Sequence, residues 1–202
     1  MLTIALPKGR IAQDTLEIFE RVFEKKFIFD DRKLILESGD FKFLLVRNQD
    51  VATYVYHQAA DIGVVGLDTL EEQGLDVIRL LDLKQGYCKV SIGMRAGEKL
   101  DFSKPELKVA TKMVNITRSY FASKAVSADI IKLYGSIELA PLVGLADMIV
   151  DVVQTGATMK QNGLEVVEDI LESTTHLIAN KNSYFFKKSE ILDLYEKING
   201  AI

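Results

Sequence analysis

The sequence predicts an α/β fold made of two lobes. Short apolar runs of strand length alternate with segments whose apolar residues repeat at helical spacing, as in mostly parallel sheets flanked by helices. With 202 residues, 48% of them hydrophobic, the chain can form two cores, each belonging to a lobe of about 100 residues. No Pro-, Gly- or Ser-rich linker divides the sequence. We therefore expect the chain to cross between the lobes through strands.

The elements of the first lobe can be placed in order. A strand at residues 2–6 precedes a helix whose apolar residues continue to about residue 23. Residues 33–37 and 41–46 predict a hairpin around the turn at residues 38–40. The remaining expected elements are a helix at 49–59, a strand at 61–65, a short helix at 67–73 and a strand at 77–83.

The second half continues the alternation. Strands are predicted at 88–94, 108–112, 129–134 and 148–153, and helices at 116–126, 137–142 and near 159–162. Two further strands are expected at 165–172 and 176–180, and a last helix at 189–199. The segments ADIGVVG (60–66) and ADMIVDV (146–152) are similar to each other. We expect each to deliver a loop and a helix start at the carboxyl edge of a sheet, where α/β folds bind ligands.

Composition excludes several classes of function. The 25 basic and 29 acidic side chains give a formal net charge of −4, unlike a strongly electropositive nucleic-acid binder. The single cysteine, Cys88, cannot form an internal disulfide, and no Cys/His cluster has zinc-ligand spacing. The first residues are apolar and then charged, the wrong order for a signal peptide, and no apolar run approaches a membrane span. We expect a cytoplasmic protein that binds neither nucleic acid nor membrane.

The most informative segment is DVVQTGATMKQNGL, residues 151–164. An apolar strand reaches Asp151, and a turn that opens a helix follows, formed by Thr155, Gly156, Ala157 and Thr158. Consecutive backbone N–H groups, two hydroxyls and a glycine that permits close approach can receive a phosphate. Asp151 could accept hydrogen bonds from ribose hydroxyls or hold Mg²⁺. The alternative is a strand–turn–helix junction with hydroxyl caps.

Two cations surround a glycine near the start of the chain. Lys8, Gly9 and Arg10 lie between a predicted strand and a predicted helix, where Arg10 could grip a phosphate through two hydrogen bonds. A solvated helix start is the alternative. Cations at a helix N-terminus oppose the helix dipole, which favours the interpretation with an anionic ligand.

Other polar residues follow predicted strands. Arg47 could contact a nucleotide and Asp68 a base or ribose, although Asp68 also lies where a helix cap is expected. Glu138, in a loop before a predicted helix, could face a ligand. Arg32 lies in a charged cluster, and its pattern alone indicates a surface residue. Neither histidine has the partners of a catalytic histidine.

These segments together resemble the ATP phosphoribosyltransferase family, in its short form. The turn at 155–158 resembles the loop that binds phosphoribosyl diphosphate (PRPP), although Val152 stands where the common form has a second acidic residue. The segments that carry the resemblance are LPKGR (6–10), RNQDV (47–51), ADIGVVGLD (60–68), GYC (86–88), KVATKMVNITRSYF (108–121) and the continuous run from residue 135 to residue 164.

The resemblance implies a periplasmic-binding-protein-like (type II) pair of lobes with the active site in the cleft between them. The first lobe would hold residues 1–86 plus 179–202, and the second residues 87–178. The implied reaction is attack by N1 of the ATP adenine on C1 of PRPP, giving phosphoribosyl-ATP and pyrophosphate. This is the first step of histidine biosynthesis, EC 2.4.2.17.

The resemblance also implies roles for individual residues. The turn at 155–158 would hold the 5′-phosphate, with Asp151 near the ribose, whereas Lys8, Arg10, Arg47 and Asp68 would line the ATP and pyrophosphate side. Arg32 becomes a catalytic candidate beside Arg10, reaching an active site across a homodimer interface. Mg²⁺ would be the cofactor, carried by the substrate phosphates rather than by a protein metal site.

The family also has a long form, with a C-terminal domain that binds histidine. The short form instead uses a regulatory subunit similar to histidyl-tRNA synthetase, which we expect as the partner of this chain. Two alternatives remain open at this point: a solute-binding module on the same scaffold, and a phosphoribosyltransferase for another base.

Overall fold

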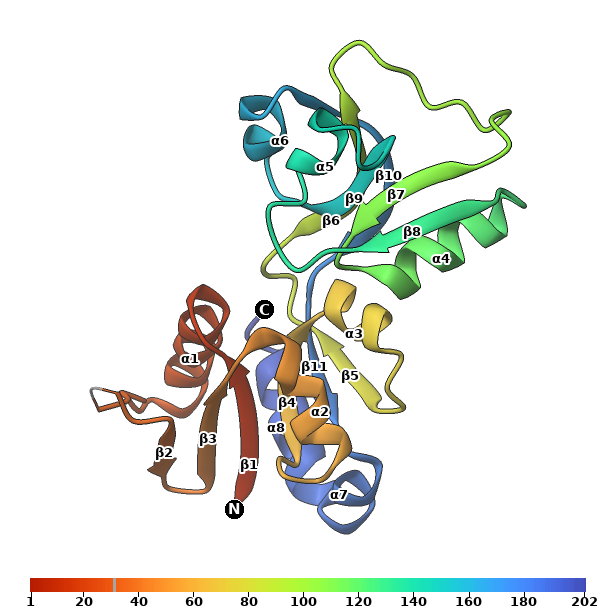
Figure 1. The fold of residues 1–202 in the computed structure, drawn as a ribbon. Coiled ribbons are helices and arrows are strands. Elements are labelled where there is room, and N and C mark those ends of the chain that lie inside the picture. Colours follow the sequence, from red (N-terminus) through yellow and green to blue (C-terminus); the bar gives the residue numbers. More distant parts are fainter. Residues whose placement is uncertain (31) are drawn as a thin grey trace. The chain divides into compact units, whose positions relative to one another are not determined.

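The computed structural model describes residues 1–30 and 32–202, and the chain divides into two compact units. Unit 1 comprises Met1–Leu70, Gly74–Gly86 and Thr174–Ile202, and unit 2 comprises Glu71–Gln73 and Tyr87–Ser173. Each unit is built on one sheet (Figure 1). The chain returns to unit 1 at Thr174 rather than at residue 179, because the strand that follows Thr174 pairs within the first sheet.

Unit 1 has a six-stranded sheet in the order β2-β3-β1-β4-β11-β5. Its strands are β1 (Leu2–Pro7), β2 (Ile35–Ser38), β3 (Phe41–Val46), β4 (Ile62–Gly66), β5 (Ile78–Asp82) and β11 (Thr175–Ala179). β3, β1 and β4 are parallel neighbours, whereas β2 and β11 run antiparallel to the strands beside them.

Helices cover both faces of this sheet. α1 (Arg10–Phe23) and α8 (Lys188–Asn199) pack on the face that carries Ile4 and Leu6 of β1. α2 (Val51–Tyr56) and α3 (Leu67–Gln73) pack on the opposite face. Because both faces are covered, β4 is buried along its whole length, which explains its continuous apolar run. The remaining short helices of the unit are η1 (Asn48–Asp50) and α7 (Lys181–Phe186).

A glycine brings α2 close to the centre of this sheet. A Cβ atom on Gly63 of β4 would lie 2.7 Å from Val55 Cγ2 and 2.8 Å from Val51 Cγ1. Both valines belong to α2 and are fully buried. The helix therefore packs at this distance only because residue 63 has no side chain.

Unit 2 has a five-stranded sheet in the order β10-β6-β9-β7-β8. Its strands are β6 (Cys88–Arg95), β7 (Leu107–Thr111), β8 (Ala128–Lys132), β9 (Met148–Val153) and β10 (Leu164–Ser173). β9, β7 and β8 are parallel, whereas β10 and β6 join by antiparallel pairing.

The two faces of the second sheet carry different helices. α4 (Val114–Ser123) packs on the face that includes Val109 and Val150, alongside β8 (Figure 1). α5 (Leu139–Leu142) and α6 (Ala157–Gln161) pack on the face that includes Ala110 and Ile149. The side chains of β7 and β9 thus alternate between the two cores, as strand geometry requires.

The predicted two-lobed α/β class is confirmed, with one difference in detail: antiparallel strands join the parallel ones in each sheet. Both sheets are mixed: the β2–β3 hairpin adds an antiparallel edge to the first, and β11 enters it antiparallel to β4. The helix expected at 49–59 is divided into η1 and the shorter α2. The sequence analysis missed α7, whose N-cap Asn180 accepts hydrogen bonds from the backbone N–H groups of Asn182 and Ser183.

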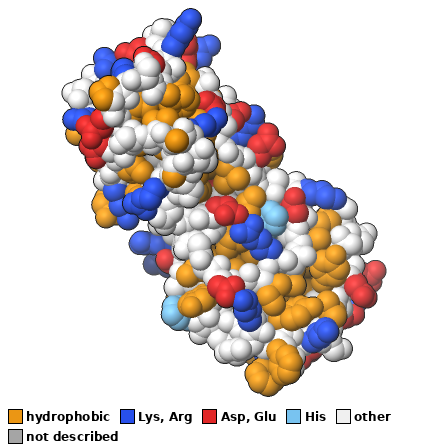
Figure 2. Space-filling model, turned by 90° about the vertical axis from the view of Figure 1, so that its right-hand side faces the viewer, with side chains coloured by type: hydrophobic (Ala, Val, Ile, Leu, Met, Phe, Trp, Pro, Cys, Tyr) orange, Lys and Arg blue, Asp and Glu red, His pale blue; other side chains and the backbone are white. Residues whose placement is uncertain are grey.

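The surface agrees with the composition. On the face shown in Figure 2, basic and acidic side chains are interspersed rather than gathered into one strongly basic patch. Within residues 1–30 and 32–202, none of the helices has the length and the apolar character that a transmembrane span requires.

Candidate active site

A cavity of about 230 Å³ lies at the carboxyl end of β9 in unit 2. Asp151 and the residues that follow it to Met159 line this cavity, and Glu138, which precedes α5, completes the lining. The structure therefore brings together the predicted residues Glu138, Asp151, Thr155, Gly156, Ala157 and Thr158. β9 continues two residues beyond Asp151, so this carboxylate lies within the strand rather than at its end.

The turn at the cavity is built around a glycine. Gly156 adopts φ +75°, which favours glycine, and immediately precedes α6. The Thr155 hydroxyl accepts a hydrogen bond of 3.4 Å from the backbone N–H of Ala157. Thr155 and Thr158 are exposed, whereas Met159 is buried. A Cβ on Gly93 of β6 would lie 2.8 Å from Met159 Sδ, so that glycine lets α6 lie directly on the sheet.

Asp151 forms an ion pair that the sequence analysis did not predict. Its Oδ1 lies 2.9 Å from Nζ of Lys112, the residue that follows β7. The same oxygen accepts a hydrogen bond of 2.8 Å from the backbone N–H of Val152. The Asp151 side chain is 16% exposed and the Lys112 side chain 41% exposed. The parallel pairing of β7 and β9 creates this contact between residues far apart in the sequence.

A second group of predicted residues lies at the carboxyl edge of the six-stranded sheet. β3, β1 and β4 are parallel neighbours, so the loops after them emerge at one edge. The backbone N–H of Lys8 donates to the carbonyl of Val46 over 2.9 Å. Asn48 Nδ2 donates to Thr69 Oγ1 over 3.0 Å. These contacts place the loops that carry Lys8, Arg47 and Asp68 side by side.

The cations at this edge face solvent. Lys8, Gly9, Arg10 and Arg47 are exposed, and the Arg10 side chain has 63% of its surface accessible despite a 4.0 Å ion pair with Asp14. Gly9 adopts φ +107° where the chain turns into α1. Asp50, the N-cap residue of α2, makes no side-chain cap hydrogen bond. Asp68 lies in the first turn of α3, where an acidic side chain suits the helix dipole.

Arg32 precedes β2 at the same edge. The backbone N–H of Leu45 donates to the carbonyl of Leu34 over 2.8 Å, so antiparallel β2 begins beside the end of β3. Arg32 is exposed and adopts φ +60°. The loop before β2, which carries Arg32, therefore lies close to the end of β3. Arg47 directly follows β3.

Comparison with known proteins identifies the family. The family model HisG, described as ATP phosphoribosyltransferase, matches residues 47–200 of the chain. The chain belongs to the ATP phosphoribosyltransferase family. The resemblance found in the sequence motifs is thus confirmed.

Curated ATP phosphoribosyltransferases match along the whole chain. The protein of Sulfurimonas denitrificans is 78% identical over 202 residues, covering 100% of this chain and 97% of its own length. The protein of Helicobacter hepaticus is 59% identical over 202 residues, covering 100% and 98%.

Solved structures agree with this assignment. The chain matches the ATP phosphoribosyl transferase (HisG:HisZ) complex from Thermotoga maritima with a TM-score of 0.87 at 33% identity, covering 100% of this chain and 98% of that chain. The periplasmic aliphatic sulphonate binding protein SsuA from Escherichia coli matches with a TM-score of 0.62 at 12% identity, covering 99% and 72%. The second match shows the fold alone, and the predicted periplasmic-binding-protein-like class is confirmed.

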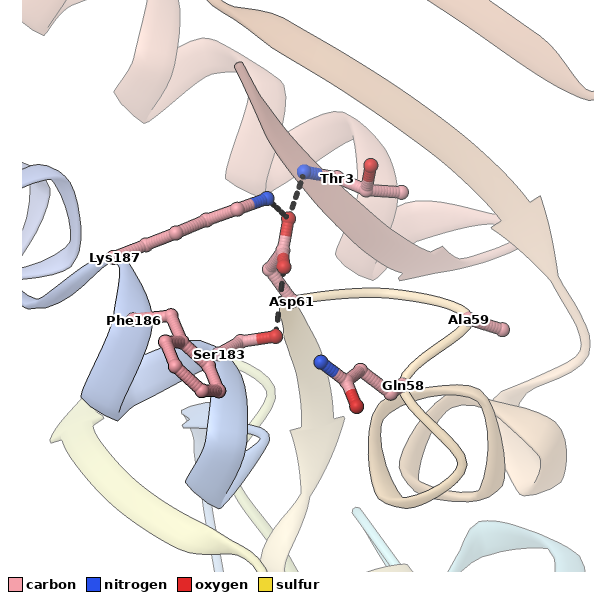
Figure 3. Close-up of a pocket in the computed structure, with 7 residues that line it drawn as sticks. All are labelled: Thr3, Gln58, Ala59, Asp61, Ser183, Phe186 and Lys187. Carbon is pink, nitrogen blue, oxygen red and sulfur yellow. Dashed lines mark hydrogen bonds and ion pairs between the residues drawn. The ribbon is translucent and has the colours of Figure 1, made fainter.

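Another cavity, of about 300 Å³, lies at the amino edge of the six-stranded sheet. This is the edge opposite the loops that carry Lys8, Arg47 and Asp68. Asp61, just before β4, is only 8% exposed and lies at its centre (Figure 3). Its Oδ2 accepts from Lys187 Nζ at 2.7 Å and from the backbone N–H of Thr3 at 2.9 Å, and its Oδ1 accepts from the Ser183 hydroxyl at 2.7 Å.

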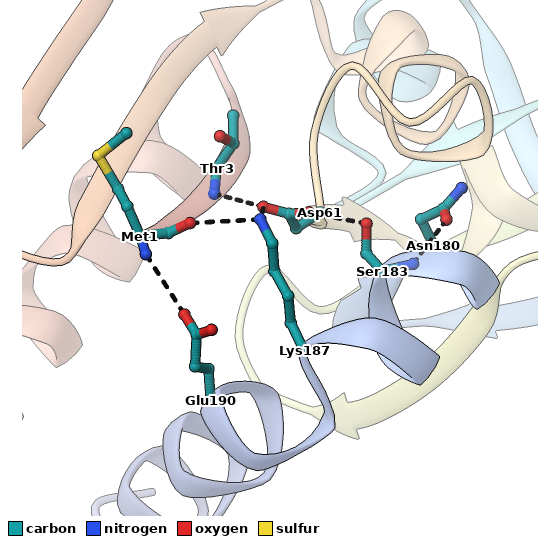
Figure 4. A network of polar contacts seen from close by, with 7 residues as sticks. All are labelled: Met1, Thr3, Asp61, Asn180, Ser183, Lys187 and Glu190. Carbon is teal, nitrogen blue, oxygen red and sulfur yellow. Dashed lines mark hydrogen bonds and ion pairs between the residues drawn. The ribbon is translucent and has the colours of Figure 1, made fainter.

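This polar network connects the C-terminal helices to the six-stranded sheet. Burial alone would raise the pKa of Asp61, but the hydrogen bonds from Lys187, Thr3 and Ser183 outweigh burial and lower it. Lys187 Nζ also contacts the carbonyl of Met1 at 3.3 Å, and the N-terminal ammonium pairs with Glu190 at 3.4 Å (Figure 4). The network therefore fastens the C-terminal helices to the start of β1 and β4, and its polar groups are already paired within the protein.

Proposed function

We propose that the carboxyl edges of the two sheets bind the two substrates of the family reaction separately. As a member of this family the chain is an ATP phosphoribosyltransferase, EC 2.4.2.17, which joins ATP to PRPP in the first step of histidine biosynthesis. The cavity at residues 151–159, with its two threonines and its glycine turn, is the observation that carries the assignment of PRPP to unit 2.

Within this cavity each residue has a chemical role. The exposed hydroxyls of Thr155 and Thr158 and the backbone N–H groups of the turn bind the 5′-phosphate of PRPP, an arrangement that suits phosphate groups. Asp151 accepts hydrogen bonds from the ribose hydroxyls. Glu138, which lines the same cavity, contacts the sugar end of the substrate.

The edge of the six-stranded sheet binds ATP and the leaving pyrophosphate. Lys8, Arg10 and Arg47 supply positive charge there, Gly9 lets the chain approach the phosphates closely, and Asp68 accepts a hydrogen bond from the nucleoside. The solvent-facing position of Arg10 supports this role. Arg32 acts as a further catalytic cation, contributed across the interface of a homodimer.

The reaction itself requires positioning and charge stabilisation. A bond forms between adenine N1 and C1 of the ribose while the bond from C1 to the pyrophosphate oxygen breaks, and pyrophosphate leaves with that electron pair. Positive charge develops on the sugar and negative charge concentrates on the leaving group. Adenine N1 is unprotonated near neutral pH, so no general base is required. Holding the two substrates in line and neutralising pyrophosphate with Arg10 therefore supply most of the catalysis.

Mg²⁺ fits this arrangement as an ion that enters with the substrate. Across the described residues no cluster of three or more His, Cys, Asp and Glu side chains could hold a metal ion, and the cavity offers the two carboxylates of Asp151 and Glu138. Mg²⁺ typically takes one or two carboxylates together with substrate phosphates. When bound, Mg²⁺ supplies positive charge to the departing pyrophosphate.

A regulatory partner completes the proposal. The Thermotoga maritima relative, 33% identical to this chain, is described as a HisG:HisZ complex. We propose that this chain likewise assembles with a regulatory subunit similar to histidyl-tRNA synthetase, which would confer activation and feedback by histidine.

Direct assay tests the activity. The purified chain, incubated with ATP, PRPP and Mg²⁺ with and without the regulatory subunit, is expected to form phosphoribosyl-ATP and pyrophosphate. The division of substrates is tested by Thr155→Ala combined with Thr158→Ala, which should weaken PRPP binding in calorimetry far more than ATP binding. Ser119→Ala, an exposed hydroxyl on α4, is the matched control. Equal losses for both substrates would refute the division.

A further inference from the structure

Lys112 contacts the lining of the unit 2 cavity through its ion pair with Asp151. It follows β7 directly, and the register of β7 with β9 pairs Thr111 with Val150. Lys112 and Asp151 are therefore neighbours at the same level of the sheet. Because Ala110 and Ile149 pack on the α5 and α6 face, the alternation of strand side chains places Lys112 and Asp151 on that face as well. The cavity lies on the same face.

The cavity is lined by negative charge, which Lys112 can offset. Among the described residues, the cavity lining includes two carboxylates, Glu138 and Asp151, and no lysine or arginine. The substrate assigned to the cavity is itself a polyanion, so an uncompensated Asp151 would repel it. Lys112 Nζ, 2.9 Å from Asp151 Oδ1, offsets this charge without lining the cavity.

The pair also orients the carboxylate. Within the described part of the chain, the two groups that contact the Asp151 carboxylate, Lys112 Nζ and the backbone N–H of Val152, both contact Oδ1. Oδ2 is thus the oxygen left to accept from a ligand. An ion pair with a side chain 41% exposed contributes little to the stability of a fold, so stability alone does not account for this arrangement.

We propose that Lys112 is a positioning residue of the PRPP site: it neutralises Asp151 toward the incoming phosphates and fixes the carboxylate with Oδ2 toward the ribose hydroxyls. This inference rests on the proposed function, because it takes PRPP as the ligand of the cavity.

The test compares PRPP binding by a set of variants, using calorimetry of the full chain with PRPP and Mg²⁺ and steady-state kinetics. Lys112→Met should weaken PRPP binding on the order of tenfold, the effect of one unpaired charge several ångströms from a phosphate at a partly exposed site. Lys112→Arg should stay within about threefold of wild type, since it keeps the charge. ATP binding should be unchanged in both.

Three further measurements separate positioning from a structural effect. Lys124→Met is the matched control, because Lys124 forms a 3.5 Å pair with Glu168 in the same unit at similar exposure. The loss in Lys112→Met should shrink as salt is raised, since the effect is electrostatic. Combining Lys112→Met with Asp151→Asn should cost no more than Asp151→Asn alone, because the two side chains act as a pair.

The outcomes distinguish a failure of the Lys112 role from a failure of the assignment of PRPP to the cavity. If Asp151→Asn weakens PRPP binding but Lys112→Met behaves like Lys124→Met, the role of Lys112 is overturned and the cavity assignment stands. If Asp151→Asn leaves PRPP binding unchanged, the cavity assignment itself fails. Should Lys112→Met not fold, Lys112→Gln and Lys112→Arg replace it; equal PRPP affinity in these two variants would overturn the requirement for charge.

Discussion

Replacing Asp61 by alanine should destabilise unit 1 without changing the chemistry of the enzyme. The substitution removes the acceptor of three hydrogen bonds of 2.7–2.9 Å. Two of the donors, the backbone N–H of Thr3 and the hydroxyl of Ser183, then lose their partner at a largely buried place. Lys187 has a side chain that is 35% exposed, so its ammonium can turn to water and its share is discounted.

The magnitude follows from these burials. An unsatisfied buried donor costs about 1–3 kcal/mol, and two of them with a discounted ion pair give a loss of about 3 kcal/mol in the free energy of unfolding. For a chain of this size each kcal/mol lowers Tm by about 2–4 °C. We therefore expect Tm to fall by roughly 6–12 °C.

Thermal unfolding followed by circular dichroism measures this effect. Asp76→Ala is the control, because the Asp76–Lys181 pair also ties a C-terminal helix to the same unit but both side chains are more than half exposed. Its loss should stay below about 1 kcal/mol. If the two variants melt at the same temperature, the burial argument is wrong. At 20 °C, kcat/KM of Asp61→Ala should equal that of wild type, since Asp61 lies at the sheet edge opposite the predicted site residues.

The effect should also depend on pH. The pKa of Asp61 is lowered in the folded protein, so its stabilising contribution is complete above its unfolded pKa of about 4. That contribution is lost as pH falls through the lowered folded pKa. The difference in stability between wild type and Asp61→Ala should be constant from pH 7 to about pH 5 and should shrink in stronger acid.

Three further predictions concern activity and packing. Arg10→Ala should lower kcat/KM by on the order of 10²-fold, as loss of a charge-stabilising group does; near wild-type turnover in steady-state assays would remove Arg10 from the proposed site. Gly63→Ala should cost about 1–3 kcal/mol by overpacking against Val51 and Val55, and a wild-type urea midpoint would show that α2 can move aside. Chelation by EDTA should abolish product formation and added Mg²⁺ should restore it; turnover that persists in EDTA would exclude a substrate-borne ion.

Local signals in the sequence predicted much of the fold and the turn at residues 155–158. Strand β9 followed by the turn at Gly156 is visible because apolar residues, hydroxyls and a glycine with positive φ are consecutive in the chain. The β2–β3 hairpin is visible for the same reason. Each of these features depends on neighbouring residues, so periodicity and turn chemistry suffice to find it.

Features created by long-range pairing could not be found this way. The Lys112–Asp151 contact depends on the register between β7 and β9, which the sequence TKM around Lys112 does not encode. The sheets are mixed because β11 enters the first between β4 and β5 and β6 pairs antiparallel to β9 in the second, choices of partner that strand periodicity does not determine. α7 has a single buried side chain, Ser183, and so lacks an apolar stripe; Asn180, a favourable N-cap residue, was the one local signal that could have revealed it.

The interior position of β11 has a consequence for how the chain folds during synthesis. Residues 87–173 form nearly all of unit 2 as one continuous segment, so its sheet can assemble as soon as that segment has left the ribosome. The six-stranded sheet must wait, because β4 and β5 have no strand to join them until Thr175–Ala179 emerges. The six-stranded sheet is thus completed only after unit 2 has been made, and until then the exposed edges of β4 and β5 leave the nascent chain vulnerable to misassembly.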